Sequence, residues 1–373
     1  MDFDFTEDQV SLRDAVARWV EKGFGFERRH ALAKAGGSTR EVYQELAELG
    51  LTALAIDSEH GGMGFGPVEA MVVMEELGRG LVNAPYAQGA LVAPALLRSA
   101  PEALQQAWLS RMAEGSALVV LAQQERGLRY RLDSCSTTAS QAQGQGQWTI
   151  NGRKSVVAAG DEADAFIVPA MADGHLQLFL VERAAKGLAV RGYPTQDGAR
   201  AAELALSNTP ASLITAQGLN ALSYAADVGL AATCAEAVGL MDRLVAITVE
   251  YLNTRKQFGV ALSSFQALRH RMADVKMQLE LGRSMSYFAT LKLGEPESAR
   301  RRALSQAKVQ LNQSMRFVGQ QCVQMHGGIG VTDEYSASHY FKRLTMLEMT
   351  WGDTPHHMAE LSHHMQDTAG VFA

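Results

Sequence analysis

The chain has 373 residues, a formal net charge of −6, 47% hydrophobic residues and 20% charged residues. This composition is typical of a globular protein and excludes a disordered, collagen-like or low-complexity chain. The length predicts about two to three domains, and the acidic balance argues against nucleic acid as a partner.

The three cysteines, Cys135, Cys234 and Cys322, are widely separated and odd in number. We expect neither a disulfide framework nor a zinc site from them, which fits a reducing cytoplasm. The acidic first residues do not resemble a secretory signal. Because no apolar run reaches the roughly 20 residues that a membrane-spanning helix needs, we predict a cytoplasmic protein with no membrane partner.

The first segment, from residue 5 to about residue 112, has the apolar periodicity of helices. Thr6 and Gln9 have the spacing of a capping box at the start of the first helix. A second helix is predicted over about 39–49, and a glycine-rich break at 59–66 separates it from a third.

Short strands are predicted between residue 117 and about residue 215. They cover 118–122, 147–152, 154–157, 165–168 and 176–181. Asn151-Gly152 predicts a tight hairpin turn, and residues 139–147 an exposed loop tip. The spacing of the strands favours an antiparallel sandwich or barrel.

Long helices return after residue 219, over about 224–254, 265–293 and 307–325. The charged stretch 295–305 is predicted to turn into the third of them. Glycines after His326 provide a C-cap there. Helices of this kind pack as an antiparallel bundle.

Three features of the helical segments are candidate binding sites. Residues 61–66 (GGMGFG) and 327–330 (GGIG) lack the strand that precedes a dinucleotide-binding turn. The first segment is predicted to be a plain connection between two helices. The second lets either another backbone segment or a ligand approach closely. Arg255 either complements the end of its helix or pairs with a phosphate.

Histidine pairs at 356–357 and 363–364 lie two turns apart on a predicted helix. No carboxylates have a matching spacing, and histidines are common on protein surfaces. We therefore predict no metal site.

Two motifs at the right mutual spacing carry a family resemblance. TRKQFG (254–259) ends one long helix and QMHGGIG (324–330) ends a later one. With the helix–strand–helix order, they make the whole chain resemble the acyl-CoA dehydrogenase family. The segments MDFDFTEDQ, AQQERGLRY, YPTQDGARAAE and FKRLTMLEMTWGDTPHHMAEL are similar to the small-subunit type of pimeloyl-CoA dehydrogenase, which often forms half of a heteromeric enzyme.

The resemblance implies an α+β multidomain fold. It consists of an N-terminal all-α domain over 1–115, a middle antiparallel β-barrel over 116–215 and a C-terminal four-helix bundle over 216–373. It also implies FAD, bound in an extended form between protomers.

The implied cofactor contacts fall on three parts of the chain. Arg255 is implied to pair with the FAD pyrophosphate, which suits a guanidinium. The same cofactor is implied to be lined by Phe258 and Gln266. The cofactor of a neighbouring protomer is implied to be reached by Gln324, Gly327 and Gly328. The isoalloxazine ring is implied to contact three barrel residues, Gln123, Gln124 and Ala158.

The implied reaction is the α,β-dehydrogenation of an acyl-CoA thioester. A carboxylate removes the α-proton, the β-hydrogen leaves as hydride to flavin N5, and an electron-transfer flavoprotein accepts the electrons. Fatty acid, steroid side-chain or dicarboxylate catabolism is the implied setting.

The sequence departs from the family at the catalytic base. The usual glutamate position is Gly352, and the alternative position on the first bundle helix is Gly229. A nearby family arginine falls on Leu230, and the serine of the thioester arm on Tyr130. The small-subunit resemblance implies a dicarboxylyl, branched or ring-bearing acyl group, and the small residues at 352 and 229 are expected to leave room for a bulky one.

Three hypotheses follow. In the one we favour, a partner chain supplies the base within an α2β2 heterotetramer. In the second, a displaced carboxylate replaces it, with Asp353 ahead of Asp227 and Glu348, although Asp353 also suits the N-cap of the last helix. In the third, the chain removes no proton and is a structural FAD-binding subunit or a flavoprotein with other acyl-CoA chemistry, since losing a base costs about 10²–10⁴-fold in rate.

Overall fold

The computed structural model describes residues 4–141 and 147–369. The chain divides into two units. The helical unit comprises Met1–His30, Pro67–Val82 and Leu230–Ala373, and the barrel unit comprises Ala31–Gly66 and Asn83–Gly229.

In the part of the chain that the structure describes, six α-helices precede the first strand. They are α1 (Glu7–Gly23), α2 (Phe26–Lys34), α3 (Arg40–Glu48), α4 (Pro67–Arg79), α5 (Ala93–Leu97) and α6 (Glu102–Ala113). The capping box is confirmed: the Gln9 N–H donates to Thr6 Oγ1 at 3.2 Å, and the Thr6 N–H donates to Gln9 Oε1 at 3.0 Å. Helices α3 and α4 match the predicted second and third helices.

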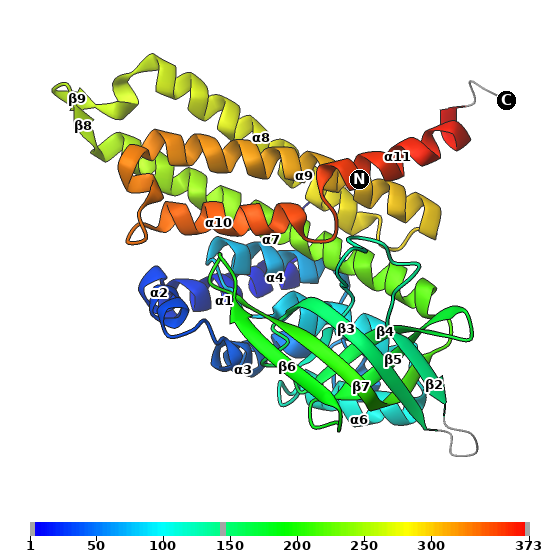
Figure 1. The fold of residues 1–373 in the computed structure, drawn as a ribbon. Coiled ribbons are helices and arrows are strands. Elements are labelled where there is room, and N and C mark those ends of the chain that lie inside the picture. Colours follow the sequence, from blue (N-terminus) through cyan, green and yellow to red (C-terminus); the bar gives the residue numbers. More distant parts are fainter. Residues whose placement is uncertain (1–3, 142–146, 370–373) are drawn as a thin grey trace. The chain divides into compact units, whose positions relative to one another are not determined.

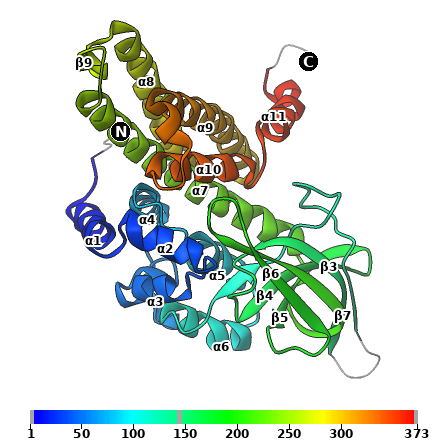
Figure 2. The ribbon, with the colours of Figure 1, turned by 60° about the vertical axis from the view of Figure 1, so that its left-hand side comes forward.

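In the described part of the chain, five strands close a ring in the order β4, β2, β3, β7, β5 and back to β4. Figure 2 labels four of them, β3, β4, β5 and β7. The strands are β1 (Val119–Leu121), β2 (Thr138–Gln141), β3 (Trp148–Ala158), β4 (Ala165–Ala172), β5 (His175–Glu182), β6 (Leu188–Pro194) and β7 (Arg200–Thr215). Most pairings are antiparallel, but β1 and β2 run parallel to β4. Buried Ile150, Phe166 and Phe179 belong to the core inside this barrel.

The predicted hairpin at Asn151-Gly152 is wrong, because β3 runs straight through it. The register between β3 and β7 shifts at this point, as in a β-bulge. The Asn151 side chain bonds to Asn208 on β7 instead of closing a turn. Glycine is needed at 152 because a Cβ there would lie 2.5 Å from Thr137 Oγ1. The predicted loop tip at 139–147 begins within β2, and its residues 142–146 lie outside the described part.

A buried ion pair lies in the barrel unit. Lys154 Nζ donates to Glu125 Oε1 at 2.7 Å, and neither side chain is more than 5% exposed. Glu125 also accepts from the Thr137 hydroxyl at 2.6 Å and from the Ser136 N–H at 2.6 Å. Burial alone would raise the pKa of Glu125, but these donors, led by Lys154, lower it to about 2.

The C-terminal helices pack around α9 (Figure 1). They are α7 (Gly218–Thr254), α8 (Gln266–Leu291), α9 (Glu297–His326), α10 (Ser336–Met349) and α11 (Thr354–Ala369). Helix α9 already begins at Glu297, so the turn predicted over 295–305 is mostly helix. Its Arg300, Ala303 and Leu304 are buried, which stabilises these turns despite their charges.

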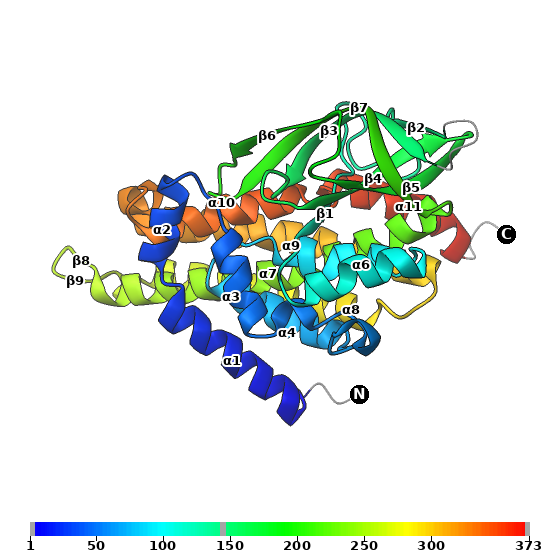
Figure 3. The ribbon, with the colours of Figure 1, turned by 90° about the horizontal axis from the view of Figure 1, so that it is seen from below.

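Helix α4 packs closely against α7 in the helical unit (Figure 3). Gly78 of α4 meets the backbone of Glu236, and Gly239 of α7 meets the backbone of Glu75. A Cβ at either position would overlap a carbonyl oxygen. Beside this contact, Arg283 of α8 pairs with Glu75. Arg283 also pairs with Asp242 of α7, so the backbone contact and these ion pairs together fix the middle of α7.

All three cysteines are free. Among the described residues, no helix is both long and apolar enough to cross a membrane.

Replacing Glu125 by Gln should lower the free energy of unfolding by about 3–5 kcal/mol, because it leaves the Lys154 ammonium buried without a counter-charge. The matched control is Asp57→Asn, which removes a half-exposed pair with Arg98 and should cost less than about 1 kcal/mol. Urea unfolding followed by circular dichroism measures both. Equal losses would contradict the role of the buried pair.

The difference between wild type and Glu125→Gln should depend on pH. The carboxyl has a lower pKa in the folded chain (about 2) than in the unfolded chain (about 4.3). The contribution of the ionised Glu125 carboxylate to the free energy of unfolding is therefore fully present above about pH 4.3. It disappears as the pH falls to about 2. Unfolding curves at pH 7, 4 and 3 should show the two proteins converging.

Candidate active site

Predicted cofactor residues gather at the end of α7 in the helical unit. Arg255 follows the last turn of α7 and is exposed. The hairpin of β8 (Lys256–Gln257) and β9 (Val260–Ala261) comes next and turns through Phe258 and Gly259. Both turn residues have positive φ, 54° and 82°, as a type I′ turn requires. This turn leaves the Phe258 ring 92% exposed, and exposed Gln266 begins α8.

The end of α9 lies beside the end of α7. The ring of His326 packs against those of Tyr251, 4.7 Å away, and Tyr335, 5.1 Å away. Its Nδ1 lies 2.8 Å from the Cys322 carbonyl oxygen and can only donate to it, and burial lowers its pKa, so the ring is neutral. These contacts place the two motifs of the resemblance at one end of the bundle.

The α9 end has the open backbone that a phosphate group needs. Gln324, Gly327 and Gly328 are exposed, and a Cβ at either glycine would meet nothing within 4 Å. Gly327 has a φ of 65° and a ψ of −142°, a positive-φ backbone conformation that glycine adopts readily. With the exposed Arg255 guanidinium at the same end, these residues fit a pyrophosphate.

The other three predicted cofactor residues lie in the barrel unit. Gln123 and Gln124 follow β1, and Ala158 ends β3 with its side chain exposed. The Ser155 N–H donates to the Gln124 carbonyl at 2.8 Å, which ties the two segments together. The structure thus brings these three residues to neighbouring segments of the barrel.

The predicted catalytic position lies in the turn between α10 and α11. Trp351 and Gly352 both have positive φ, 61° and 124°. The expected room beside Gly352 is absent, because a Cβ there would lie 2.4 Å from His357 Nε2 and 2.6 Å from His356 Cδ2. Asp353 acts as a helix cap, its Oδ1 accepting from the His356 N–H at 2.9 Å.

The other two candidate carboxylates are engaged or buried. Glu348 pairs with Arg316, and Asp227 is 1% exposed on α7. Gly229 and Leu230, the positions of the alternative base and of the family arginine, are buried on the same helix.

Helix α9 supports the turn through two side chains that the sequence analysis missed. Lys308 is fully buried, and its Nζ donates to the Leu347 carbonyl at 2.5 Å, at the end of α10. Burial lowers its pKa to about 8. One turn earlier, Ser305 bonds to His357. The sequence did contain a signal for the buried role of Lys308, because this lysine lies between Leu304 and Leu311 on the apolar face of a helix.

His357 also corrects the expectation of surface histidines. Its side chain is 3% exposed, and burial, with the charges of Lys308 and His356, lowers its pKa to about 3. The side chain of His364 lies outside the described part.

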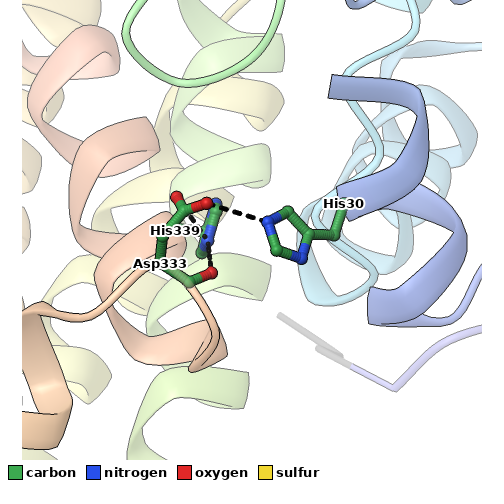
Figure 4. A group of neighbouring side chains, drawn as sticks. All are labelled: His30, Asp333 and His339. Carbon is green, nitrogen blue, oxygen red and sulfur yellow. Dashed lines mark hydrogen bonds and ion pairs between the residues drawn. The ribbon is translucent and has the colours of Figure 1, made fainter. Parts of the chain in front are cut away.

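His30, Asp333 and His339 bring three potential metal ligands within 4.8 Å of one another (Figure 4). Arg29 Nη1 donates to His339 Nδ1 at 2.8 Å, so the Nε2 of this ring carries its proton and donates to the Asp333 carbonyl at 2.8 Å. A protonated nitrogen does not bind a metal. The group is therefore a hydrogen-bond network that ties α2 to the start of α10, and sequence spacing gave no sign of it.

Family models cover most of the chain. The N-terminal, middle and C-terminal domains of acyl-CoA dehydrogenase match residues 6–116, 121–209 and 216–365. The acyl-CoA dehydrogenase IpdE2 of Mycobacterium tuberculosis is 30% identical over 90% of this chain and 91% of its own. FadE27 of the same organism, also an acyl-CoA dehydrogenase, is 28% identical over 99% and 100%.

Solved structures agree. A chain of the ChsE4–ChsE5 complex from Mycobacterium tuberculosis superposes with a TM-score of 0.89 at 26% identity, covering 99% of this chain and 100% of that one. The chain therefore belongs to the acyl-CoA dehydrogenase family. The predicted fold, the enzyme class of an oxidoreductase acting on CH–CH groups, and FAD as the family's cofactor are confirmed.

Arg255→Ala should weaken retention of FAD by about 10–100-fold, because it removes charged hydrogen bonds worth about 1.5–3 kcal/mol. The control is Arg302→Ala, an exposed arginine near the opposite end of α9. The ratio of flavin to protein absorbance after gel filtration measures retention. Unchanged flavin content in Arg255→Ala would refute the assignment.

Proposed function

We propose that this chain is one subunit of a heteromeric, FAD-dependent acyl-CoA dehydrogenase whose partner subunit supplies the catalytic base. The observation that carries the proposal is the turn at 350–353. Gly352 has no side chain, histidines fill the space beside it, and Asp353 caps α11. A carboxylate at the usual position is therefore missing, while the surface that suits FAD is present.

Exposed apolar side chains support a partner subunit. Phe258 and Val331 are 92% and 71% exposed near the ends of α7 and α9, and Met277, Leu281 and Leu291 are 43–53% exposed along α8. Large apolar patches on a protein surface typically mark interfaces. The two-component ChsE4–ChsE5 complex shows such an assembly in a similar protein, and an α2β2 heterotetramer is the form we propose.

Each part has a defined task in the proposed reaction. Arg255 binds the FAD pyrophosphate, and Gln324, Gly327 and Gly328 bind the cofactor of a neighbouring protomer. Bound FAD would supply the acceptor, at flavin N5, for the β-hydrogen that leaves as hydride. A partner carboxylate would take the α-proton, and an electron-transfer flavoprotein would be the final acceptor of the two electrons. The acyl group is proposed to be dicarboxylyl, branched or ring-bearing.

The remaining finer assignments belong to the same proposal. The domain boundaries at 1–115, 116–215 and 216–373 are supported by the three family matches. The barrel residues Gln123, Gln124 and Ala158 are proposed to contact the flavin ring. A cytoplasmic location stays a prediction.

One alternative has an observation of its own. Asp353 lies directly after the family position, so a rearranged turn would make it the base. In that case the chain would oxidise acyl-CoA by itself. A base-lacking structural FAD-binding subunit is the other alternative, and it predicts no turnover even with a partner.

The test is anaerobic bleaching of bound flavin by a panel of acyl-CoA thioesters. The purified chain alone should retain flavin but show no bleaching. The chain co-expressed with a second acyl-CoA dehydrogenase-type subunit, which carries a glutamate at one of the two family positions, should bleach, and Gln in place of that glutamate should lower the rate by about 10²–10⁴-fold.

Asp353→Asn separates the alternatives. An asparagine still caps a helix, so the complex should keep its bleaching rate within about twofold. Loss of bleaching in this variant, or bleaching by the chain alone, would make Asp353 the base. Flavin that is never bleached in any complex would favour the structural subunit.

A further inference from the structure

A chain of hydrogen bonds joins the turn between α10 and α11 to helix α9. His357 Nε2 lies 3.1 Å from the Trp351 carbonyl oxygen, and His357 Nδ1 lies 3.1 Å from Ser305 Oγ. Because a carbonyl only accepts, Nε2 carries the proton and Nδ1 accepts from the Ser305 hydroxyl. The ring is thus oriented at both nitrogens.

The same ring fills the position where a side chain at residue 352 would begin. The Cβ of any L-residue there would lie 2.4 Å from His357 Nε2 and 2.6 Å from His356 Cδ2. The two imidazoles contact each other edge to face at 4.9 Å, so neither can rotate without disturbing the other. His357 is 3% exposed and leaving its place costs two buried hydrogen bonds.

Two further contacts keep the turn from moving away. Lys308 holds the Leu347 carbonyl before the turn, and the Asp353 carboxylate holds the His356 N–H after it. Both ends of 350–353 are therefore anchored. The φ of 124° at Gly352 is a second barrier to any other residue.

We propose that His357, oriented by Ser305, is a steric block that bars a carboxylate-bearing side chain from position 352. The absence of the base is then a property of the whole packed turn and not of one residue. This inference rests on the proposed function, because it explains why the base must come from elsewhere. It adds that Gly352→Glu alone cannot restore a base here.

The experiment is a double-mutant cycle on the FAD-bound protein at fixed protein concentration. Gly352→Ala should lower the melting temperature by roughly 5–10 °C in the wild type, through overlap and backbone strain together. In a His357→Ala background, the same substitution should cost roughly 3–6 °C, because the overlap with His357 is gone while the backbone strain and the overlap with His356 Cδ2 remain. Ser305→Ala, which frees the ring at one nitrogen, should give an intermediate penalty.

Gly61→Ala is the matched control. Gly61 has a φ of 80°, and a Cβ there would meet nothing within 4 Å, so its penalty measures backbone strain without overlap. It should be smaller than the penalty of Gly352→Ala in the His357→Ala background, where the overlap with His356 Cδ2 remains. Because a merely structural His357 would give additive effects, only the steric block predicts coupling between the two positions.

Equal penalties for Gly352→Ala in all three backgrounds would overturn the block. If His357→Ala does not fold, the Ser305→Ala background is the test. The proposal is then overturned if Gly352→Ala lowers the melting temperature as much in Ser305→Ala as in the wild type. This result is independent of catalysis. Flavin bleaching by the chain alone would refute the proposed function. The melting temperatures of the double-mutant cycle would still show whether His357 blocks position 352.

Discussion

The close approach of α4 and α7 is the contact on which the helical unit depends. Gly78 and Gly239 let the two backbones meet, and Arg283 of α8 joins them by pairing with Glu75 of α4 and Asp242 of α7. Any larger residue at either glycine would push α7 outward. Since Arg255 follows the end of α7, this contact also sets the position of the surface that suits FAD.

Helix α9 has a comparable effect on the other functional region. Its last turn, through His326, packs against Tyr251 of α7 and so joins the two parts of the proposed cofactor surface. Its first half supports the turn at 350–353 through Ser305 and Lys308. One helix therefore ends at the open glycines that we propose meet a phosphate, and it closes the proposed base position about 20 residues earlier, a separation of about 30 Å along the helix.

These two regions have opposite physical character. At the proposed cofactor end the backbone of Gly327 and Gly328 is exposed and the Arg255 guanidinium, a group that suits a phosphate, is available, so little must change to bind an anion. At 352 the neighbouring atoms are packed and hydrogen-bonded, so a new side chain has to displace buried groups. This contrast is what makes a subunit that binds flavin and relies on a partner carboxylate physically consistent.

The sequence by itself determined the order of helices and strands, the capping box at Thr6 and the motifs around Arg255 and Gly327, because these depend on local periodicity and on short fixed spacings. It also showed that glycine stands at 352. Only the tertiary structure decided that β3 passes through Asn151-Gly152 and that His357 fills the space beside residue 352. Both depend on side chains that are far apart along the chain, Asn208 in the first case and Ser305 in the second, and no local pattern encodes such contacts.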